Sequence, residues 1–344
     1  MGGTGLIGRA VAEHLVTEGW EVTATGRNRD RMPAELAEKG AIFIEADRGS
    51  AADMALAVRS GAELVVDCVC YTASDARVIQ PHLGAVGSLV MLSSKAVYVD
   101  DAGNHPNSDV RPRFPVPITE TQPTMTPGDM PYDSREGYGA NKVAAEQVVL
   151  GSGHPVTVLR ASKVHGPWSN QPREWVFARR ALDGRRPLIL VDGGRGIDHP
   201  TAVDNIASLV ATVAARPGAR VLNCADPDAP SGLEIARIVA DHLGHEWDEV
   251  LLPSGAPPGF PGLGSHPWDA PHPIVLDMSA ASALGYQPAG DYASTVTKGL
   301  DWLVDASNGG AGRAMLPPED DPYFARLFDY QSEDRYLAGL TRSS

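Results

Sequence analysis

A tyrosine and a lysine four residues apart, Tyr138 and Lys142 in the run YGANK, are the side chains best suited to catalysis in this 344-residue chain. A phenol ordinarily titrates near pH 10, so a tyrosine acts as a general acid or base only where its pKa falls toward the working pH. If YGANK opens a helix, the two side chains lie one turn apart on one face, and the ammonium stabilises the phenolate. The spacing therefore predicts proton transfer by Tyr138, with Lys142 also placed to hold the ribose of a bound nucleotide.

Such a pair needs a third polar group that donates a hydrogen bond to the reacting oxygen. Ser94 closes the apolar run LVMLSS, which predicts a strand that ends beside the same site. Tyrosine and lysine arise at this spacing by chance in many chains, so the pattern gains weight only from its place after a nucleotide-binding half. We predict that Ser94, Tyr138 and Lys142 form the catalytic set.

The chain opens with MGGTGLIGRA, in which Gly2, Gly5 and Gly8 recur at every third position. Glycines let the backbone turn tightly, let a pyrophosphate approach and let the following helix pack on a sheet. The helix N-terminus then offers free N–H groups and a partial positive charge to the phosphates. Glycine turns also occur in loops that bind nothing, but an amphipathic helix and a strand follow this one, which predicts a dinucleotide site.

The residues that follow the run EVTAT discriminate between two dinucleotides. Chains that bind NAD place an acidic residue about 20 positions past the glycine turn, where it accepts a hydrogen bond from the ribose 2′-hydroxyl. Gly26 stands at that place here, and Arg27 and Arg29 follow it. Because an arginine pairs with a 2′-phosphate, we predict NADP(H), with NAD less favoured; the alternative is that Arg27 is only a solvated turn residue. Asp47, at the end of the next strand, is placed either to meet the adenine or to form a simple turn.

Strand and helix patterns alternate through the first two thirds of the chain. Nearly continuous apolar runs, typical of strands covered on both faces, predict strands over 21–25, 41–47, 63–71, 88–94, 156–162 and 220–226. Helical spacing of apolar residues occupies 9–19, 50–61 and 141–153. This alternation predicts an α/β fold built on a doubly wound parallel sheet.

Three stretches interrupt the alternation. Residues 100–137 are rich in Pro, Gly, Asp and Asn and are long for a connection, which predicts either a lid over the active site or a disordered loop. Residues 253–273 form a second Pro/Gly tract, interpreted as a surface excursion of a second region. From 308 to 344 the chain is first Gly-rich and then aromatic and charged, a pattern that fits either a docking helix or a disordered end.

The composition excludes several classes of protein. Acidic residues outnumber basic ones 43 to 29, and the net charge of −14 disfavours a nucleic-acid surface. No apolar run reaches the length of a membrane span and no secretion signal is visible, so we expect a cytoplasmic protein with no membrane partner. Three cysteines give no disulfide framework, and the scattered histidines give no metal-ligand spacing, so we expect no metal.

The runs GGTGLIG, LSSKAVY, YGANKVAAE, LRASKVHGP and AVDNIA together resemble the extended short-chain dehydrogenases/reductases, the NAD-dependent epimerase/dehydratase family. The motifs stand in family order, and the resemblance extends to about residue 305. It implies a Rossmann domain over 1–160 and a smaller substrate-binding region over 161–307, in which 200–226 returns to the Rossmann sheet. Residues 308–344 would form a C-terminal extension.

The resemblance assigns Ser94, Tyr138 and Lys142 to the catalytic triad of the family, in which the tyrosine exchanges a proton with the substrate while a hydride moves to or from the nicotinamide. It also implies a homodimer that packs helices of each subunit together and a small-molecule substrate. The expected cofactor contacts are Gly2, Gly5, Leu6, Ile7, Gly8, Arg27, Asp47, Arg48, Thr72, Ala73, Tyr138, Lys142 and Val164.

In the family, an apolar strand precedes the glycine turn and lies near the middle of the sheet, whereas only Met1 precedes Gly2 in this sequence. Without that strand, two flanking strands lose hydrogen-bond partners, and each buried orphan group costs roughly 1–3 kcal/mol. We therefore hypothesise that the natural chain starts upstream and that the start codon was assigned too late.

Several positions around the substrate depart from the family pattern. Lys95 and Ala96 stand where nucleotide-sugar dehydratases carry Asp and Glu, which disfavours 4,6-dehydration and sugar-acid decarboxylation. Asp198 stands where an arginine grips a diphosphate, and Arg195 nearby is the substitute if the loop is shifted. Three further positions differ and weaken the nucleotide-sugar interpretation: Val99, Lys163 and His165.

Three functions remain open at this point. The leading one is an NAD(P)-dependent oxidoreductase that reduces a carbonyl, or oxidises a secondary alcohol, of a small polar substrate. The alternative is a sugar or nucleotide-sugar epimerase, which uses the same residues but returns its cofactor unchanged. The third is a non-enzymatic NADP-binding sensor or RNA-binding relative, which the presence of Tyr138 and Lys142 and the acidic charge disfavour.

Overall fold

The computed structural model describes residues 1–341, and the chain divides into two compact units. Unit 1 comprises Met1–Val164, His199–Pro227 and Ile274–Asp291, and unit 2 comprises His165–Asp198, Asp228–Pro273 and Tyr292–Ser344. Unit 1 thus takes in the segment at 274–291, which the sequence interpretation placed in the substrate-binding region.

Four parallel strands form the main sheet of unit 1, in the order β3 (Ala62–Asp67), β4 (Val86–Ser94), β5 (Val156–Ala161) and β9 (Arg220–Cys224). Two shorter parallel strands, β1 (Thr23–Gly26) and β2 (Ile42–Glu45), pair only with each other within residues 1–341. These strands fall on the six predicted runs with shifted ends. The predicted α/β class with a parallel, Rossmann-like sheet is confirmed.

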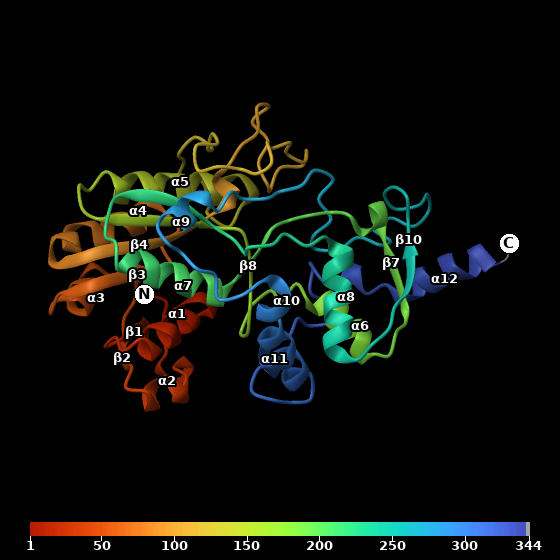
Figure 1. The fold of residues 1–344 in the computed structure, drawn as a ribbon, viewed down its shortest axis with the longest axis horizontal. Helices are drawn as coiled ribbons and strands as arrows, with labels where there is room; N and C mark the ends of the chain where they lie inside the picture. Colours follow the sequence, from red (N-terminus) through yellow and green to blue (C-terminus); the bar gives the residue numbers. More distant parts are fainter. Residues whose placement is uncertain (342–344) are drawn as a thin grey trace. The chain divides into compact units, whose positions relative to one another are not determined.

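Helices cover both faces of this sheet (Figure 1). Val90 and Leu92 of β4 belong to the core beneath α1 and α7, whereas Leu89 and Met91 belong to the core beneath α3, α4 and α5. Successive side chains of a strand point to opposite faces, so one apolar strand fills two cores. The helices of unit 1 are α1 (Leu6–Thr17), α2 (Ala34–Glu38), α3 (Ala51–Val58), α4 (Ala73–Ile79), α5 (Arg135–Leu150), α7 (Val203–Ala214) and α9 (Ser279–Ala283).

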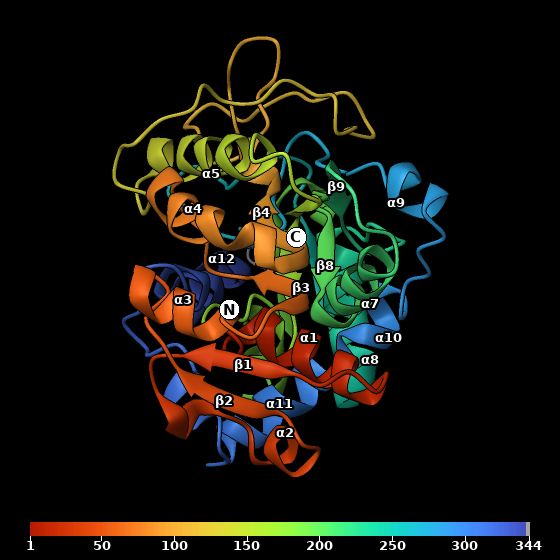
Figure 2. The same cartoon turned by 90° about the vertical axis from the view of Figure 1, so that its left-hand side faces the viewer.

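The first residues of the chain lie between β3 and β1, as the N label in Figure 2 shows. The Met1 ammonium donates to the Val66 carbonyl of β3, and the Gly3 N–H donates to the Thr25 carbonyl of β1 at 2.9 Å. The glycine-rich turn therefore begins in the space between two strands that do not pair with each other.

Unit 2 has its own parallel strand pair and its own hydrophobic core. β7 (Pro187–Leu190) pairs with β10 (Asp248–Leu251), and the Trp268 ring stacks on Phe177 at a centroid distance of 5.8 Å. Trp268 comes from the Pro/Gly tract at 253–273, so this tract supplies part of the core. The helices of unit 2 are α6 (Trp175–Leu182), α8 (Gly232–Leu243), α10 (Tyr292–Thr295), α11 (Thr297–Ser307) and α12 (Tyr330–Thr341). Two further short strands pair with each other, β6 (Lys163–His165) and β8 (Pro200–Ala202), and β8 belongs to unit 1.

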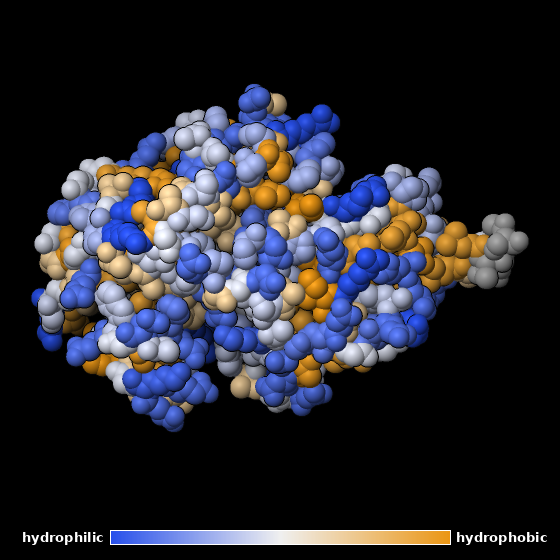
Figure 3. All heavy atoms as spheres, viewed as in Figure 1, coloured by the Kyte–Doolittle hydropathy of each residue, from blue (hydrophilic) through white to orange (hydrophobic). Residues whose placement is uncertain are grey.

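The C-terminal extension contains a docked helix, and the alternative of a disordered end is wrong for the described residues. Glu333 of α12 is 5% exposed and accepts hydrogen bonds from Arg180 at 2.6 and 3.0 Å and from Arg185 at 2.9 Å. Because a buried carboxylate is costly unless it is paired, these contacts fix α12 on the α6 region. Hydrophobic residues gather on the surface of α12 near the C-terminus, where Leu340 is exposed (Figure 3). Residues 342–344 of the predicted extension lie outside the described part.

The stretch at 100–137 is held by polar contacts rather than by helices or strands. The Asp100 carboxylate accepts hydrogen bonds from backbone N–H groups of the stretch, including that of Arg113 at 2.9 Å. His105 is buried, and its Nε2 lies 2.8 Å from Glu136 Oε2 in the first turn of α5. The disordered-loop alternative is therefore wrong, and the role of a lid stays a prediction.

Candidate active site

The glycine-rich turn exposes the N-terminus of α1 to a ligand. Gly5 is the N-cap and has no side chain with which to cap the first turn, and that turn contains no acidic residue. The first N–H groups of the helix therefore suit an anion. A Cβ on Gly8 would collide with the Gly2 carbonyl, so the tight turn requires glycine at this position. The turn fits the pyrophosphate of a dinucleotide.

Basic side chains gather around the loop after β1. Arg27 is exposed and forms no ion pair within residues 1–341. The Arg29 guanidinium lies 5.2 Å from the centroid of the Phe43 ring. Arg9, which the sequence interpretation missed, donates to the Arg31 carbonyl at 2.7 Å, and burial together with the Arg31 charge lowers its pKa. Positive charge therefore dominates the place where a 2′-phosphate is expected.

Asp47 and Arg48, both predicted cofactor contacts, differ in their surroundings. The Asp47 side chain is exposed and accepts a hydrogen bond from the Gly49 N–H at 2.9 Å. Arg48 donates to the fully buried carboxylate of Asp67 at 2.8 and 2.5 Å. Burial acts to lower the pKa of Arg48, but the adjacent Asp67 charge raises it above its usual value. Arg48 is thus engaged in fixing the end of β3, and its contact with a cofactor stays a prediction.

Thr72 and Ala73 lie at the start of α4, next to the end of β3. Thr72 Oγ1 accepts from the Asp75 N–H at 3.1 Å, and Asp75 Oδ2 accepts from the Thr72 N–H at 2.9 Å. This reciprocal cap fixes the beginning of the helix. Because β3 ends at Asp67, residues 68–71 form a connection to α4 rather than the end of the predicted strand at 63–71.

Lys142 is fixed by two backbone carbonyls, one near the end of β4 and one in the connection after β3. Its side chain is buried, and the ammonium donates to the carbonyls of Leu92 at 2.9 Å and Cys70 at 2.8 Å. It also lies 4.5 Å from the centroid of the Tyr71 ring, within the range of a cation–π contact. Leu92 stands two residues before Ser94 in the same strand, so the lysine is tied to the strand end that carries the serine.

Tyr138 and Ser94 are both half-buried and lie on adjoining elements. Ser94 Oγ accepts from the Ala96 N–H at 3.2 Å, which leaves its O–H as a donor. Gly139, the neighbour of Tyr138, packs so closely on the Ala96 carbonyl that a Cβ would collide with it. The structure therefore brings the first turn of α5, which carries Tyr138, against the turn that follows Ser94. The catalytic roles of the three residues stay predictions.

The sequence interpretation missed two tyrosines that lie beside this cluster. Tyr71 and Tyr132 stack with ring centroids 5.3 Å apart and planes 22° from parallel. Burial, and to a lesser degree the proximity of Tyr138, raises the pKa of Tyr71 to about 12. Tyr132 belongs to the stretch at 100–137, so this stretch is linked to Lys142 through the Tyr71 ring. No spacing signal reveals a contact between two aromatic rings so far apart in the chain.

The remaining expected positions divide between the units. Val164 packs against the core beneath α1 and α7, and Lys95, next to Ser94, is buried. The positions expected around the substrate lie as follows: Lys95, Ala96, Val99 and Lys163 in unit 1, and His165, Arg195 and Asp198 in unit 2. Within residues 1–341, no helix has the length and apolar character needed to cross a bilayer.

Comparison with solved structures finds the same fold in nucleotide-sugar enzymes. A double mutant of DesIV, the dTDP-glucose 4,6-dehydratase of Streptomyces venezuelae, with NAD and DAU bound, matches at a TM-score of 0.65 and 18% identity, over 91% of this chain and 98% of that one. UDP-glucose 4-epimerase of Thermotoga maritima, with UDP-glucose, matches at 0.64 and 16%, over 89% and 98%. The dTDP-glucose 4,6-dehydratase of Bacillus anthracis, with NAD, matches at 0.66 and 14%, over 91% and 97%. At these identities the likeness establishes the fold alone.

A match to a family profile establishes more than the fold. No curated protein matches the chain. The sequence profile of the NAD dependent epimerase/dehydratase family, a family of enzymes, matches residues 1–225, which is more than half of the chain and includes the glycine turn, Ser94, Tyr138 and Lys142. The resemblance found in the motifs is therefore confirmed, and the chain belongs to the NAD-dependent epimerase/dehydratase family, the extended short-chain dehydrogenases/reductases.

Proposed function

We propose that this protein is an NADP(H)-dependent oxidoreductase that acts on the carbonyl group, or the secondary alcohol, of a small polar substrate. The observation that carries the proposal is the position of the Lys142 ammonium, which lies 2.9 Å from the Leu92 carbonyl. Leu92 stands two residues before Ser94 in β4, and Lys142 stands one helical turn after Tyr138 in α5. This arrangement supports a site in which a hydroxyl, a phenol and an ammonium serve one substrate oxygen.

Each residue of the set has a distinct role in the proposal. Tyr138 gives its phenolic proton to the substrate oxygen during reduction and takes it back during oxidation. Ser94 donates a hydrogen bond to the same oxygen, and the Lys142 charge stabilises the phenolate that Tyr138 becomes. The nicotinamide, when bound, supplies or accepts the hydride; the glycine turn and the α1 N-terminus would hold its pyrophosphate.

The proposed preference for NADP(H) rests on charge. The solved structures named above that contain a dinucleotide carry NAD. In this chain, however, Gly26 ends β1 and the exposed Arg27 follows it, where a carboxylate would discriminate against a 2′-phosphate, and Arg9 and Arg29 add positive charge nearby. A homodimer and a cytoplasmic location remain predictions.

A second candidate is a nucleotide-sugar epimerase, because the fold neighbours include a UDP-glucose 4-epimerase and the same three residues serve that reaction. Dehydration is disfavoured, since the short helix η3 (Lys95–Val97) after Ser94 offers no carboxylate to protonate a leaving hydroxyl.

The experiment incubates the purified protein with NADPH or NADH and a panel of small aldehydes, ketones, and UDP- and dTDP-sugars. Net loss of nicotinamide absorbance with a carbonyl compound, abolished in Tyr138→Phe, is the expected result. Conversion of a sugar to its epimer with no net change of cofactor selects the second candidate. A protein that binds NADPH but turns over no member of the panel contradicts both and favours the sensor alternative.

A further inference from the structure

The Lys142 ammonium has a third contact besides its two carbonyls, and that contact is the Tyr71 ring. An ammonium carries three N–H donors, and two of those of Lys142 reach the Cys70 carbonyl at 2.8 Å and the Leu92 carbonyl at 2.9 Å. The centroid of the Tyr71 ring lies 4.5 Å from the same nitrogen, and Lys142 is 3% exposed. A cation that is removed from water gains more from a ring face than an exposed one does. Cys70 and Tyr71 therefore hold one ammonium together, the first through its backbone and the second through its ring.

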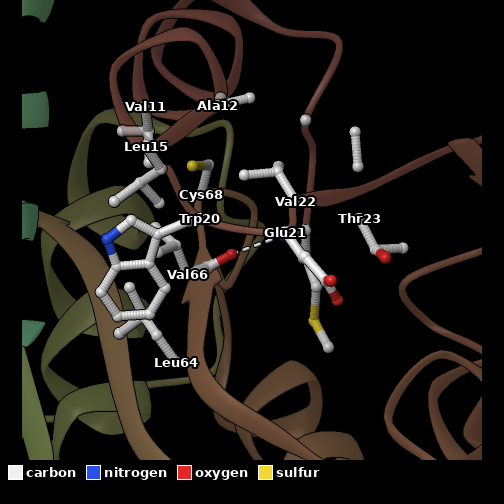
Figure 4. Close-up of a pocket in the computed structure, with 14 residues that line it drawn as sticks. Val11, Ala12, Leu15, Trp20, Glu21, Val22, Thr23, Leu64, Val66 and Cys68 are labelled. Atoms are coloured by element: carbon white, nitrogen blue, oxygen red, sulfur yellow. Dashed lines mark hydrogen bonds between the residues drawn. The ribbon is translucent and has the colours of Figure 1, made fainter. Parts of the chain in front are cut away.

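The connection that carries Tyr71, residues 68–71, is held at both ends. The Cys68 N–H donates to the Met1 carbonyl at 3.2 Å, and the Cys68 side chain packs on the core beneath α1 and α7, where it lies beside α1 (Figure 4). At the other end, the Tyr71 N–H donates to Asp75 Oδ2 in the first turn of α4 at 2.9 Å. A tyrosine on a held backbone keeps only its two side-chain torsions, so the place of the ring depends on what it packs against.

Tyr132 supplies that packing. Its ring stacks on Tyr71 with the centroids 5.3 Å apart, although Tyr132 itself is 49% exposed. The backbone that leads into Tyr132 is tied to α5, because Asn141 Nδ2 donates to the Met130 carbonyl at 2.5 Å. The helix that carries Lys142 thus also anchors the residue that stacks on the ring, and the contacts form a closed circuit through Tyr132 and Tyr71.

We infer that Tyr71 is a positioning residue whose ring holds the Lys142 ammonium in place, one helical turn from Tyr138, while Tyr132 holds the ring. The inference rests on the proposed function only for its effect on turnover. The ring face makes the contact, so phenylalanine serves as well as tyrosine at this position. Burial, and to a lesser degree the proximity of Tyr138, raises the pKa of Tyr71 to about 12, so its phenol keeps its proton at neutral pH and does not compete with Tyr138 as a base. The competing role is a hydrogen bond from the Tyr71 hydroxyl to the substrate, which phenylalanine does not supply.

The contact itself is measured without a substrate. Lys142 is one of five lysines, and in protein labelled with ¹³C-lysine the Lys142→Met variant assigns its signal. Because a ring current moves protons above the ring face upfield, the protons on Cε of Lys142 should be shifted upfield in the unmodified protein and in Tyr71→Phe, and not in Tyr71→Leu. Tyr132→Leu, at a more exposed residue, should reduce the shift, and this variant decides the question if Tyr71→Leu does not fold.

The catalytic consequence is measured as turnover of the substrate identified in the panel. Tyr71→Leu should lower kcat about 10-fold and leave KM within about twofold, because the charge that stabilises the phenolate is displaced while the substrate contacts remain. Tyr71→Phe, which keeps the ring, should have a kcat within about twofold of that of the unmodified protein. Tyr336→Leu removes a comparable aromatic contact, that with Phe260 in unit 2, and as the matched control should change neither quantity.

Three results overturn the inference. Equal Lys142 shifts in Tyr71→Phe and Tyr71→Leu show that the ring does not hold the ammonium. A Tyr71→Leu protein that loses the shift but keeps its kcat shows that the contact does not position the catalytic set. An equal loss of kcat in Tyr71→Phe and Tyr71→Leu assigns the role to the hydroxyl. If no member of the panel is turned over, the proposed function fails, and the Lys142 shift still decides whether Tyr71 holds the ammonium.

Discussion

The two halves of unit 1 position their polar groups in different ways. In the half built on β4, β5 and α5, buried charges have buried partners: Glu146 accepts from Arg160 at 2.7 Å and from Ser93 at 2.5 Å, and Lys142 donates to two carbonyls. In the half built on the glycine turn, β1 and β2, Arg27 is exposed, and β2 is the one strand that pairs with β1 within residues 1–341. The comparison teaches that contacts within the protein fix Lys142, a predicted catalytic residue, whereas Arg27, the predicted contact of a 2′-phosphate, is exposed.

Lys142→Met is expected to have the largest effect, because it removes the positive charge beside Tyr138 and leaves two carbonyls without their donor. Turnover of the substrate identified in the panel should fall by about 10³-fold. Lys39→Met, at an exposed lysine, is the matched control and should leave turnover unchanged. Retained turnover in Lys142→Met would contradict the proposed role of Lys142 in catalysis.

Arg160→Met tests the preorganised half through stability. The change leaves the Glu146 carboxylate, 2% exposed, without its ion-pair partner, and should lower the free energy of unfolding by about 3–5 kcal/mol in urea titrations. Glu146→Gln in the same chain should restore part of the loss, because it removes the unpaired charge. A loss below about 1 kcal/mol, the range of surface pairs, contradicts the account.

Arg27→Ala tests the nucleotide half. If Arg27 pairs with a 2′-phosphate, its removal should raise the NADPH dissociation constant about 10-fold and leave that of NADH unchanged, as measured by fluorescence titration. Arg59→Ala, at another exposed arginine, is the control. An equal change for both dinucleotides assigns Arg27 to the solvated turn.

The smallest predicted effect is a loss of folding stability at alkaline pH. Burial raises the pKa of the Cys70 thiol from 9.0 to about 12, so the folded state holds this proton more tightly than the unfolded chain. The stability due to this thiol is complete below pH 9 and is lost as the pH rises toward 12; roughly 1 kcal/mol should disappear between pH 8 and pH 10. Thermal unfolding of Cys70→Ala should show a shallower decline over this range, and parallel curves for the two proteins would contradict the prediction.

The sequence predicted what depends on local pattern. Apolar runs located β1 to β5 and β9 of unit 1. The YGANK spacing correctly indicated a helix start, although α5 begins six residues before the predicted helix at 141 because Ser134 caps it. The glycine spacing identified the tight turn in which Gly8 packs against the Gly2 carbonyl. These features follow from short-range geometry, which a single sequence records.

What the sequence left open depends on contacts between distant residues. Nothing in the local pattern pairs Tyr71 with Tyr132, or Arg180 with Glu333, so neither the aromatic stack nor the docking of α12 was specified. For the same reason the sequence did not reveal that Arg48, in the loop after β2, pairs with the buried Asp67 at the end of β3. Substrate specificity involves positions of the same kind, which is why the substrate class remains a proposal.

The most direct test of the central claim is Tyr138→Phe, measured for cofactor affinity and turnover in parallel. The account predicts an NADPH dissociation constant within about threefold of that of the unmodified protein and a turnover lower by about 10³-fold, because only the phenolic proton is lost. Turnover that survives the substitution, or that falls only in proportion to cofactor binding, would contradict the assignment of Tyr138 as the proton donor.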